Sequence, residues 1–178
     1  TESYKQGLAS LKEVVESSPE PEMAYEIQEI ELPEVKYLLM SADVHPQDIG
    51  DYYEASFSAI MKYMEESGVA MEGYPTGLYY SWTDTLAKMS AAIPVAAEIA
   101  GTEEIEYRVV KASTALVIDY YGAYDGSGAA HYAMDDYINA NNLEVAGAVR
   151  EVYVTDPMEE ADTAKWHTQI IYPVTAAE

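Results

Sequence analysis

The feature that most constrains the fold is an internal repeat. Residues 73–79, GYPTGLY, align with residues 147–153, GAVREVY, at an offset of 74 positions. Further along, IPV at 93–95 aligns with YPV at 172–174 at an offset of 79, and the five additional residues fall in a loop at 155–166, where insertions are tolerated. Because self-similarity of this kind indicates a duplicated structural unit, the chain is predicted to contain two copies of one unit.

The apolar pattern predicts the same order of elements in each copy: strand, helix, strand and strand. Alternating apolar residues indicate strands, and apolar residues at helical spacing indicate helices. The elements expected in the first copy are strands at 24–32, 76–82 and 89–95, with a helix that begins near Asp48 and ends at Gly68. Residues 35–44 are expected to form a second strand or the continuation of the first beyond Pro33. The elements expected in the second copy are strands at 114–124, 150–156 and 167–174, with a helix at 127–142.

The predicted fold class is therefore α+β, a tandem pseudo-twofold βαββ repeat. Two antiparallel sheets with helices on one side would leave a ligand groove between the repeats. Repeat one is expected at about 33–98 and repeat two at about 110–175, within one domain at 23–178. Residues 1–22 are expected to form an N-terminal helix, at 4–17, and a linker rich in Ser, Pro and Glu.

The charge balance excludes some partners. The 178 residues include 32 acidic and 9 basic side chains, for a net charge of −23. Such a surface repels phosphate backbones, so no direct nucleic-acid contact is expected. No apolar run is long enough to cross a bilayer, so no membrane contact by this segment is expected either. The charge has two open interpretations, attraction of a cationic ligand or general solubility and adaptation to salt.

Alternation along the strand at 150–156 places Glu151 and Tyr153 on one face. These two side chains are expected to face the groove, together with their repeat equivalents Gly77 and Tyr79, and Gly77 is expected to leave room opposite the carboxylate. The other face, expected to pack on the helices, carries Val152, Val154, Leu78, Tyr80 and Trp82. Further aromatic candidates for the groove are Tyr37, Tyr121 and Trp166, the last of which suits the pocket mouth or a cap on the final hairpin equally well.

Glu151 is the candidate with the most specific chemistry. A carboxylate in a partly buried aromatic groove is unfavourable unless something offsets its desolvation. A ligand cation, tyrosine hydroxyls or protonation through a raised pKa would do so, and aromatic rings would add cation–π attraction. The alternative is that Glu151 pairs with Arg108 or Arg150 at the surface.

The histidines do not indicate a metal site. His45, His131 and His167 are far apart in sequence and lack the spacing of metal-binding motifs. His131 is expected at the polar face or core edge of its helix. No metal and no cofactor are therefore predicted.

The second half of the chain resembles the GyrI-like domain. The resemblance is carried by Gly122-x-Tyr124, Glu151-x-Tyr153, Asp156-Pro157 and the final Pro173-Val174, and it covers roughly residues 24–174. That family is the effector-binding module of AraC- and MerR-type multidrug-responsive regulators and also occurs as a free-standing protein. It implies a tandem βαββ fold, ligands that are lipophilic cations or aromatic drugs, and a pocket glutamate at Glu151.

Three functions follow as hypotheses. The leading one is the binding of a small apolar or aromatic cation, with Glu151 as the charge-recognising residue. The first alternative, implied by some free-standing relatives, is hydrolysis of cyclopropane-type or other electrophilic toxins with Glu151 as general acid or base. The second is a protein-interaction module of a larger bacterial protein, because the N-terminal segment resembles the junction to a START-like domain. A cytoplasmic location is favoured, although a membrane-anchored parent protein would also fit.

Overall fold

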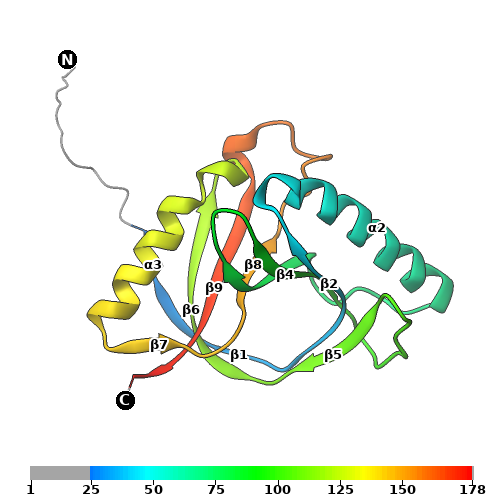
Figure 1. Ribbon diagram of the computed structural model, residues 1–178, viewed down its shortest axis with the longest axis horizontal. Coiled ribbons are helices and arrows are strands. Elements are labelled where there is room, and N and C mark those ends of the chain that lie inside the picture. Colours follow the sequence, from blue (N-terminus) through cyan, green and yellow to red (C-terminus); the bar gives the residue numbers. More distant parts are fainter. Residues whose placement is uncertain (1–24, 178) are drawn as a thin grey trace.

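Two long helices pack against one curled antiparallel sheet, as the computed structural model shows (Figure 1). The structure describes residues 25–177, apart from the side chain of Asp125. The predicted helix at 4–17 and its linker lie outside these residues. Within them, no helix is long and apolar enough to span a membrane. The elements run in the order β1 (Gln28–Leu32), β2 (Val35–Val44), η1 (Pro46–Asp48), α2 (Ile49–Ser67), β3 (Thr76–Trp82), β4 (Ala87–Pro94), β5 (Glu106–Val110), β6 (Ser113–Tyr121), η2 (Tyr124–Gly126), α3 (Gly128–Ala140), β7 (Leu143–Val145), β8 (Val149–Tyr153), η3 (Thr163–Lys165) and β9 (His167–Ala176).

The predicted α+β tandem repeat is confirmed, and the two halves share one sheet. The strand order is β1-β6-β9-β8-β3-β4-β2-β5, with β7 paired to β9. The halves meet where β3 pairs with β8, so the two sheets expected from the sequence are continuous there. In this pairing Gly77 lies opposite Glu151, which means that two repeat-equivalent residues are cross-strand partners. The pseudo-twofold axis therefore passes between them.

The short strands β5 and β7 were not predicted. β5 carries Glu106 and Arg108 along an edge of the sheet, and such charged edge strands have no clear apolar alternation. β1 and β5 occupy equivalent places, since each precedes the long strand of its repeat. β1 pairs with β6 and β5 pairs with β2, so the leading strand of each repeat joins the sheet of the other repeat.

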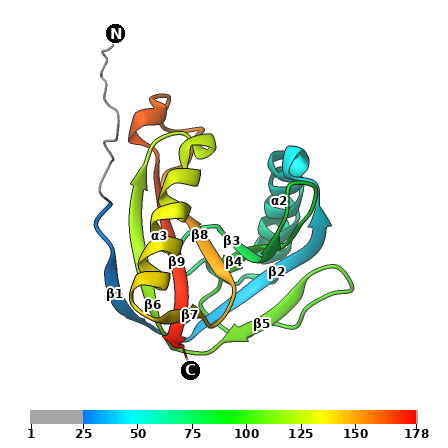
Figure 2. The ribbon, with the colours of Figure 1, turned by 60° about the vertical axis from the view of Figure 1, so that its left-hand side comes forward.

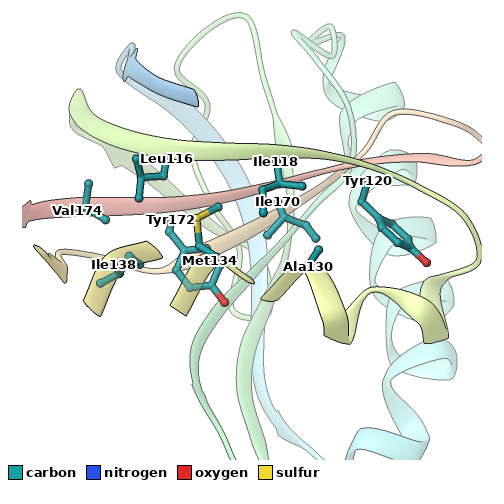
Figure 3. Packing of buried hydrophobic residues seen from close by; sticks show 9 residues of the cluster. All are labelled: Leu116, Ile118, Tyr120, Ala130, Met134, Ile138, Ile170, Tyr172 and Val174. Carbon is teal, nitrogen blue, oxygen red and sulfur yellow. The ribbon is translucent and has the colours of Figure 1, made fainter. Parts of the chain in front are cut away.

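Each helix buries one apolar stripe against the strands of its own repeat. Figure 3 shows the cluster between α3, β6 and β9, in which Met134 and Ile170 are fully buried. In the other repeat Ile60 and Met64 of α2 pack on Leu38 and on neighbouring apolar side chains. Burying each of these large side chains contributes about 1.5–3 kcal/mol, so the two clusters hold the helices in place.

The face on which the helices pack differs from the expectation. Ile170 contacts the α3 cluster and is also the cross-strand partner of Glu151, so Glu151 lies on the helix-bearing face. Val152 and Leu78 instead lie on the opposite face, in two further apolar clusters formed by the curled sheet itself. The alternation of the strands was correct, but the assignment of its two faces was wrong. The sheet buries its second face by curling, so an apolar face did not require a helix.

Candidate functional site

A large cleft is lined by residues of α2, α3, β3 and β8. Figure 2 shows the two helices on either side, with β3 and β8 between them. The volume of the cleft is about 1570 Å³. The lining is rich in aromatic residues, and their rings come from both repeats. They belong to Tyr53, Phe57, Tyr74, Tyr79, Tyr80, Trp82, Tyr124, Tyr132, Tyr153 and Tyr172. A cavity of this size and composition is suited to a small apolar ligand.

Glu151 lies in this cleft and is held by two partners. Tyr153 Oη donates a hydrogen bond of 2.8 Å to Oε1, and His131 Nε2 lies 2.6 Å from Oε2. His131 Nδ1 lies 2.7 Å from Tyr172 Oη, which fixes the imidazole ring in the wall of the cleft. Since the side chain of Glu151 is only 15% exposed, these contacts offset part of its desolvation.

The alternative in which Glu151 pairs with an arginine at the surface is wrong. Arg108 pairs with Glu106, with 2.8 Å between Nε and Oε2. Arg150 is the neighbour of Glu151 along β8 and therefore points to the opposite face of the sheet.

Three tyrosine hydroxyls meet beside the carboxylate. Tyr53 Oη lies 2.5 Å from Tyr79 Oη and 3.1 Å from Tyr153 Oη, and the remaining pair is 3.3 Å apart. Burial raises the pKa of all three hydroxyls, and the negative charge of Glu151 raises each pKa further. The three groups are therefore protonated near neutral pH. Tyr153 donates to the carboxylate, and Tyr53 and Tyr79 bond within the hydroxyl cluster.

Gly77 makes this cluster possible. A Cβ at this position would lie 2.0 Å from Tyr53 Oη and 3.2 Å from Tyr153 Oη. The room expected opposite Glu151 is thus occupied by the hydroxyl of Tyr53. The backbone of residue 77 has an ordinary strand conformation, so glycine is not needed there for its conformational freedom. Glycine is needed because a Cβ would clash with Tyr53.

The other predicted aromatic residues do not line the cleft. Tyr37 is 2% exposed and lies on the opposite face, in the cluster with Leu39 and Leu78. Tyr121 points outward and stacks on His167, with ring centroids 4.5 Å apart. Trp166 does not line the cleft but packs on Tyr124, which does, with the two ring centroids 4.9 Å apart. Side-chain alternation along β2 explains why Tyr37 lies on the opposite face, because its neighbours in the strand lie on the helix-bearing face.

Trp82, in contrast, lines the cleft although its parity predicted the other face. The register between β3 and β4 shifts between Tyr79 and Ser81, which is a β-bulge. An extra residue in one strand reverses the side-chain alternation beyond it. Trp82 is thereby moved to the face of Tyr79, and the two rings meet edge to face at 5.7 Å.

Tyr53 and His131 are the site residues that the sequence interpretation missed. The two positions differ by 78, as do Pro46 and Tyr124, which open η1 and η2. Tyr53 and His131 are therefore repeat equivalents, one on each helix, and each reaches the central strand pair. The signal was present in the helices, since both residues border an apolar stripe, but only an alignment of the two helices identifies them as a pair.

The lining of the cleft is negatively charged. It includes five carboxylates, and no Lys or Arg side chain contributes to it. The carboxylates are Glu54, Asp135, Glu151, Asp156 and Glu159. In a cleft with apolar walls these charges reinforce one another, so the potential favours cations.

A tandem α+β fold with an aromatic cleft between its repeats defines a small-molecule-binding domain. The family described as GyrI-like small molecule binding domain matches residues 25–175, so the chain belongs to this family. The resemblance stated for the sequence is confirmed. A comparison with curated proteins gave no match.

Several solved structures share the fold. The C-terminal domain of EcmrR is 21% identical, with a TM-score of 0.79, and the match covers 87% of this chain and all of that one. SAV2435 bound to tetraphenylphosphonium is 16% identical, with a TM-score of 0.56 and coverage of 86% and 94%. A hydrolase from Listeria innocua is 13% identical, with a TM-score of 0.55 and coverage of 84% and 92%.

One further match concerns partners. EcmrR in a DNA complex is 21% identical, with a TM-score of 0.79, and the match covers 98% of this chain but 63% of that one. The chain thus corresponds to part of a longer protein in that case. Freedom from nucleic-acid contact and a fused upstream domain both stay predictions for the present chain.

Proposed function

We propose that the cleft binds an aromatic, lipophilic cation and that Glu151 recognises its charge. The observation that carries this proposal is the combination of aromatic walls with five lining carboxylates and no lining Lys or Arg. Aromatic faces attract cations, and the attraction grows when the cation is removed from water. SAV2435, which shares the fold, is bound to tetraphenylphosphonium, a molecule of this chemical class.

Glu151 is suited to this role because both of its partners present a hydrogen-bond donor to the carboxylate. Tyr153 donates to the carboxylate as a neutral phenol. A neutral His131 would donate from Nε2 and accept from Tyr172 at Nδ1, so the site would keep a net negative charge. The hydroxyl cluster fixes the orientation of the carboxylate before a ligand arrives, which lowers the entropy lost on binding.

Replacing Glu151 by Gln tests the proposal. The amide keeps the shape of the side chain and removes its charge, with one acceptor oxygen left for Tyr153 and a donor in place of Oε2. We expect the Kd for tetraphenylphosphonium, measured by isothermal titration calorimetry, to rise about tenfold, or about 1.4 kcal/mol.

The matched control is Glu54→Gln, which removes one exposed carboxylate from the same cleft. Its effect is expected to stay below about threefold, because exposed charges are screened by solvent and salt. Equal effects of the two substitutions would show that Glu151 has no special role.

A second candidate function, hydrolysis of an electrophilic ligand, is favoured by the 2.6 Å contact between Glu151 and His131 at the open cleft. Glu151 would take a proton from a water molecule as the water oxygen bonds to the electrophilic carbon. The bond from that carbon to the leaving atom would break, and Glu151 would return the proton to that atom, with His131 orienting the carboxylate.

Incubation with a cyclopropane-bearing alkylator, followed by mass spectrometry, tests this candidate. The expected product has gained one water, and its formation should be slowed by Glu151→Gln. Consumption of the alkylator no faster than in buffer alone would rule the hydrolase out.

A further inference from the structure

The face of the sheet opposite the cleft contains a second, smaller pocket. Its volume is about 400 Å³, and it lies where β3 and β8 approach the turn between β5 and β6. Its charged lining residues are Arg108, Lys111 and Arg150, and no carboxylate lines it. Three of the nine basic residues of a chain with net charge −23 therefore gather at one pocket.

Arg150 is the central residue of this pocket. It is 4% exposed, and the ion pairs found among residues 25–177 do not include it. Its guanidinium carbon lies 5.9 Å from the ring centre of Tyr37. Burial raises the pKa of the Tyr37 phenol, and the positive charge of Arg150 and its hydrogen bond to the phenol oppose that rise. A buried guanidinium without a carboxylate partner is unfavourable unless an anion approaches it.

The other two cations stand at the mouth of the pocket. Lys111 is exposed in the turn after β5 and is likewise absent from the ion pairs of the described residues. Arg108 is held in place by Glu106 and by Tyr80, to which Nη1 donates a 2.8 Å hydrogen bond. Since one of the three charges is neutralised by Glu106, the pocket keeps two uncompensated positive charges.

The remaining lining indicates what shape of anion fits. Apolar side chains surround the basic residues, and Ser113 adds a hydroxyl. The planar fork of an arginine matches the two oxygens of a carboxylate or phosphate. The apolar residues of the lining are Leu78, Val110, Ala112, Ala146, Ala148 and Pro173.

We propose that this pocket binds a small oxyanion, a carboxylate or phosphate group, at Arg150 and Lys111. The site lies across the sheet from Glu151, since Arg150 and Glu151 are neighbours in β8 that point to opposite faces. Among residues 25–177, Tyr80 is the one residue that lines both the pocket and the cleft. The domain thus has a cation-binding face and an anion-binding face on the two sides of the same strand. The proposal does not depend on the ligand of the cleft.

Calorimetric titration with sodium phosphate, sodium benzoate and sodium chloride at matched ionic strength tests it. Phosphate tests the head group alone, and benzoate tests a head group with an apolar body. We expect one or both oxyanions to bind more tightly than chloride. Arg150→Met should weaken that binding at least about tenfold and Lys111→Gln about threefold.

Lys88→Gln is the matched control, because Lys88 is exposed on β4 and does not line the pocket. It should leave the anion affinity within about twofold of the original value. Lys111 is exposed, so its substitution gives a result even if Arg150→Met impairs folding. Oxyanion binding no tighter than chloride binding, or equal effects of Lys111→Gln and Lys88→Gln, would overturn the proposal.

Discussion

Tetraphenylphosphonium is expected to bind the protein at least about a hundredfold more tightly than tetraphenylborate, its anionic counterpart of nearly the same size and shape. The two ions present the same four rings to the cleft, so contacts with the aromatic walls contribute almost equally. Their charges differ, and the lining contains five carboxylates and no Lys or Arg. Attraction of one ion and repulsion of the other both add to the difference, which calorimetric titration would measure directly.

The preference for tetraphenylphosphonium can be measured at several salt concentrations. This separates the contribution of the exposed carboxylates from that of Glu151. Exposed carboxylates act through solvent and are screened within a few ångströms in about 1 M salt. Glu151 is 15% exposed and acts at short range, so its contribution should persist. A preference that survives high salt but shrinks in Glu151→Gln would assign it to this residue. Similar affinities for the two ions in low salt would contradict the proposed function.

The substitution Gly77→Ala is expected to destabilise the protein by about 2 kcal/mol and to weaken cation binding. The new methyl group would lie 2.0 Å from Tyr53 Oη, so the phenol would have to leave the hydroxyl cluster. Tyr53 stacks on Phe57 at 5.1 Å, which limits how far the ring can move. Chemical denaturation gives the change in the free energy of unfolding.

Two further variants show whether the clash is the cause. In the double variant Gly77→Ala with Tyr53→Phe, the hydroxyl that the methyl group would meet is absent, so part of the lost stability should return. Gly147→Ala is the matched control, since a Cβ there would meet only Pro173 at an ordinary 3.7 Å. If Gly147→Ala were as destabilising as Gly77→Ala, close approach of Tyr53 would not explain the requirement for glycine.

Much of the fold could be predicted because the duplication left two independent patterns for one unit. Strands β2 and β3 begin and end at the predicted residues, and both helices lie where their apolar stripes indicated. Edge strand β5 was missed, because a strand stabilised by pairing with β2 on one side needs little apolar alternation. Pairing between distant strands is a tertiary effect that no local pattern encodes.

The site could be predicted only in part. Alternation correctly grouped Glu151, Tyr153, Gly77 and Tyr79 on one face. Glu151, Tyr153 and Tyr79 line the cleft, and Gly77 lies against the hydroxyl of Tyr53. Alternation could not tell which face the helices cover, since both faces of the curled sheet are apolar. The partner of Glu151 is a histidine on α3, which an alignment of the two helices could have indicated but strand alternation could not.

The exchange of leading strands has a consequence for how such a chain can arise. A single repeat on its own would leave two strand edges unpaired. Two identical copies could pair both edges by exchanging their first strands, which would form a symmetric homodimer. In such a dimer the residues on the axis would be identical, either two carboxylates that repel each other or two glycines without charge. Joining the copies in one polypeptide removes this restriction. One position is Gly77 and its counterpart is Glu151, so the axis of a nearly symmetric scaffold carries a single carboxylate.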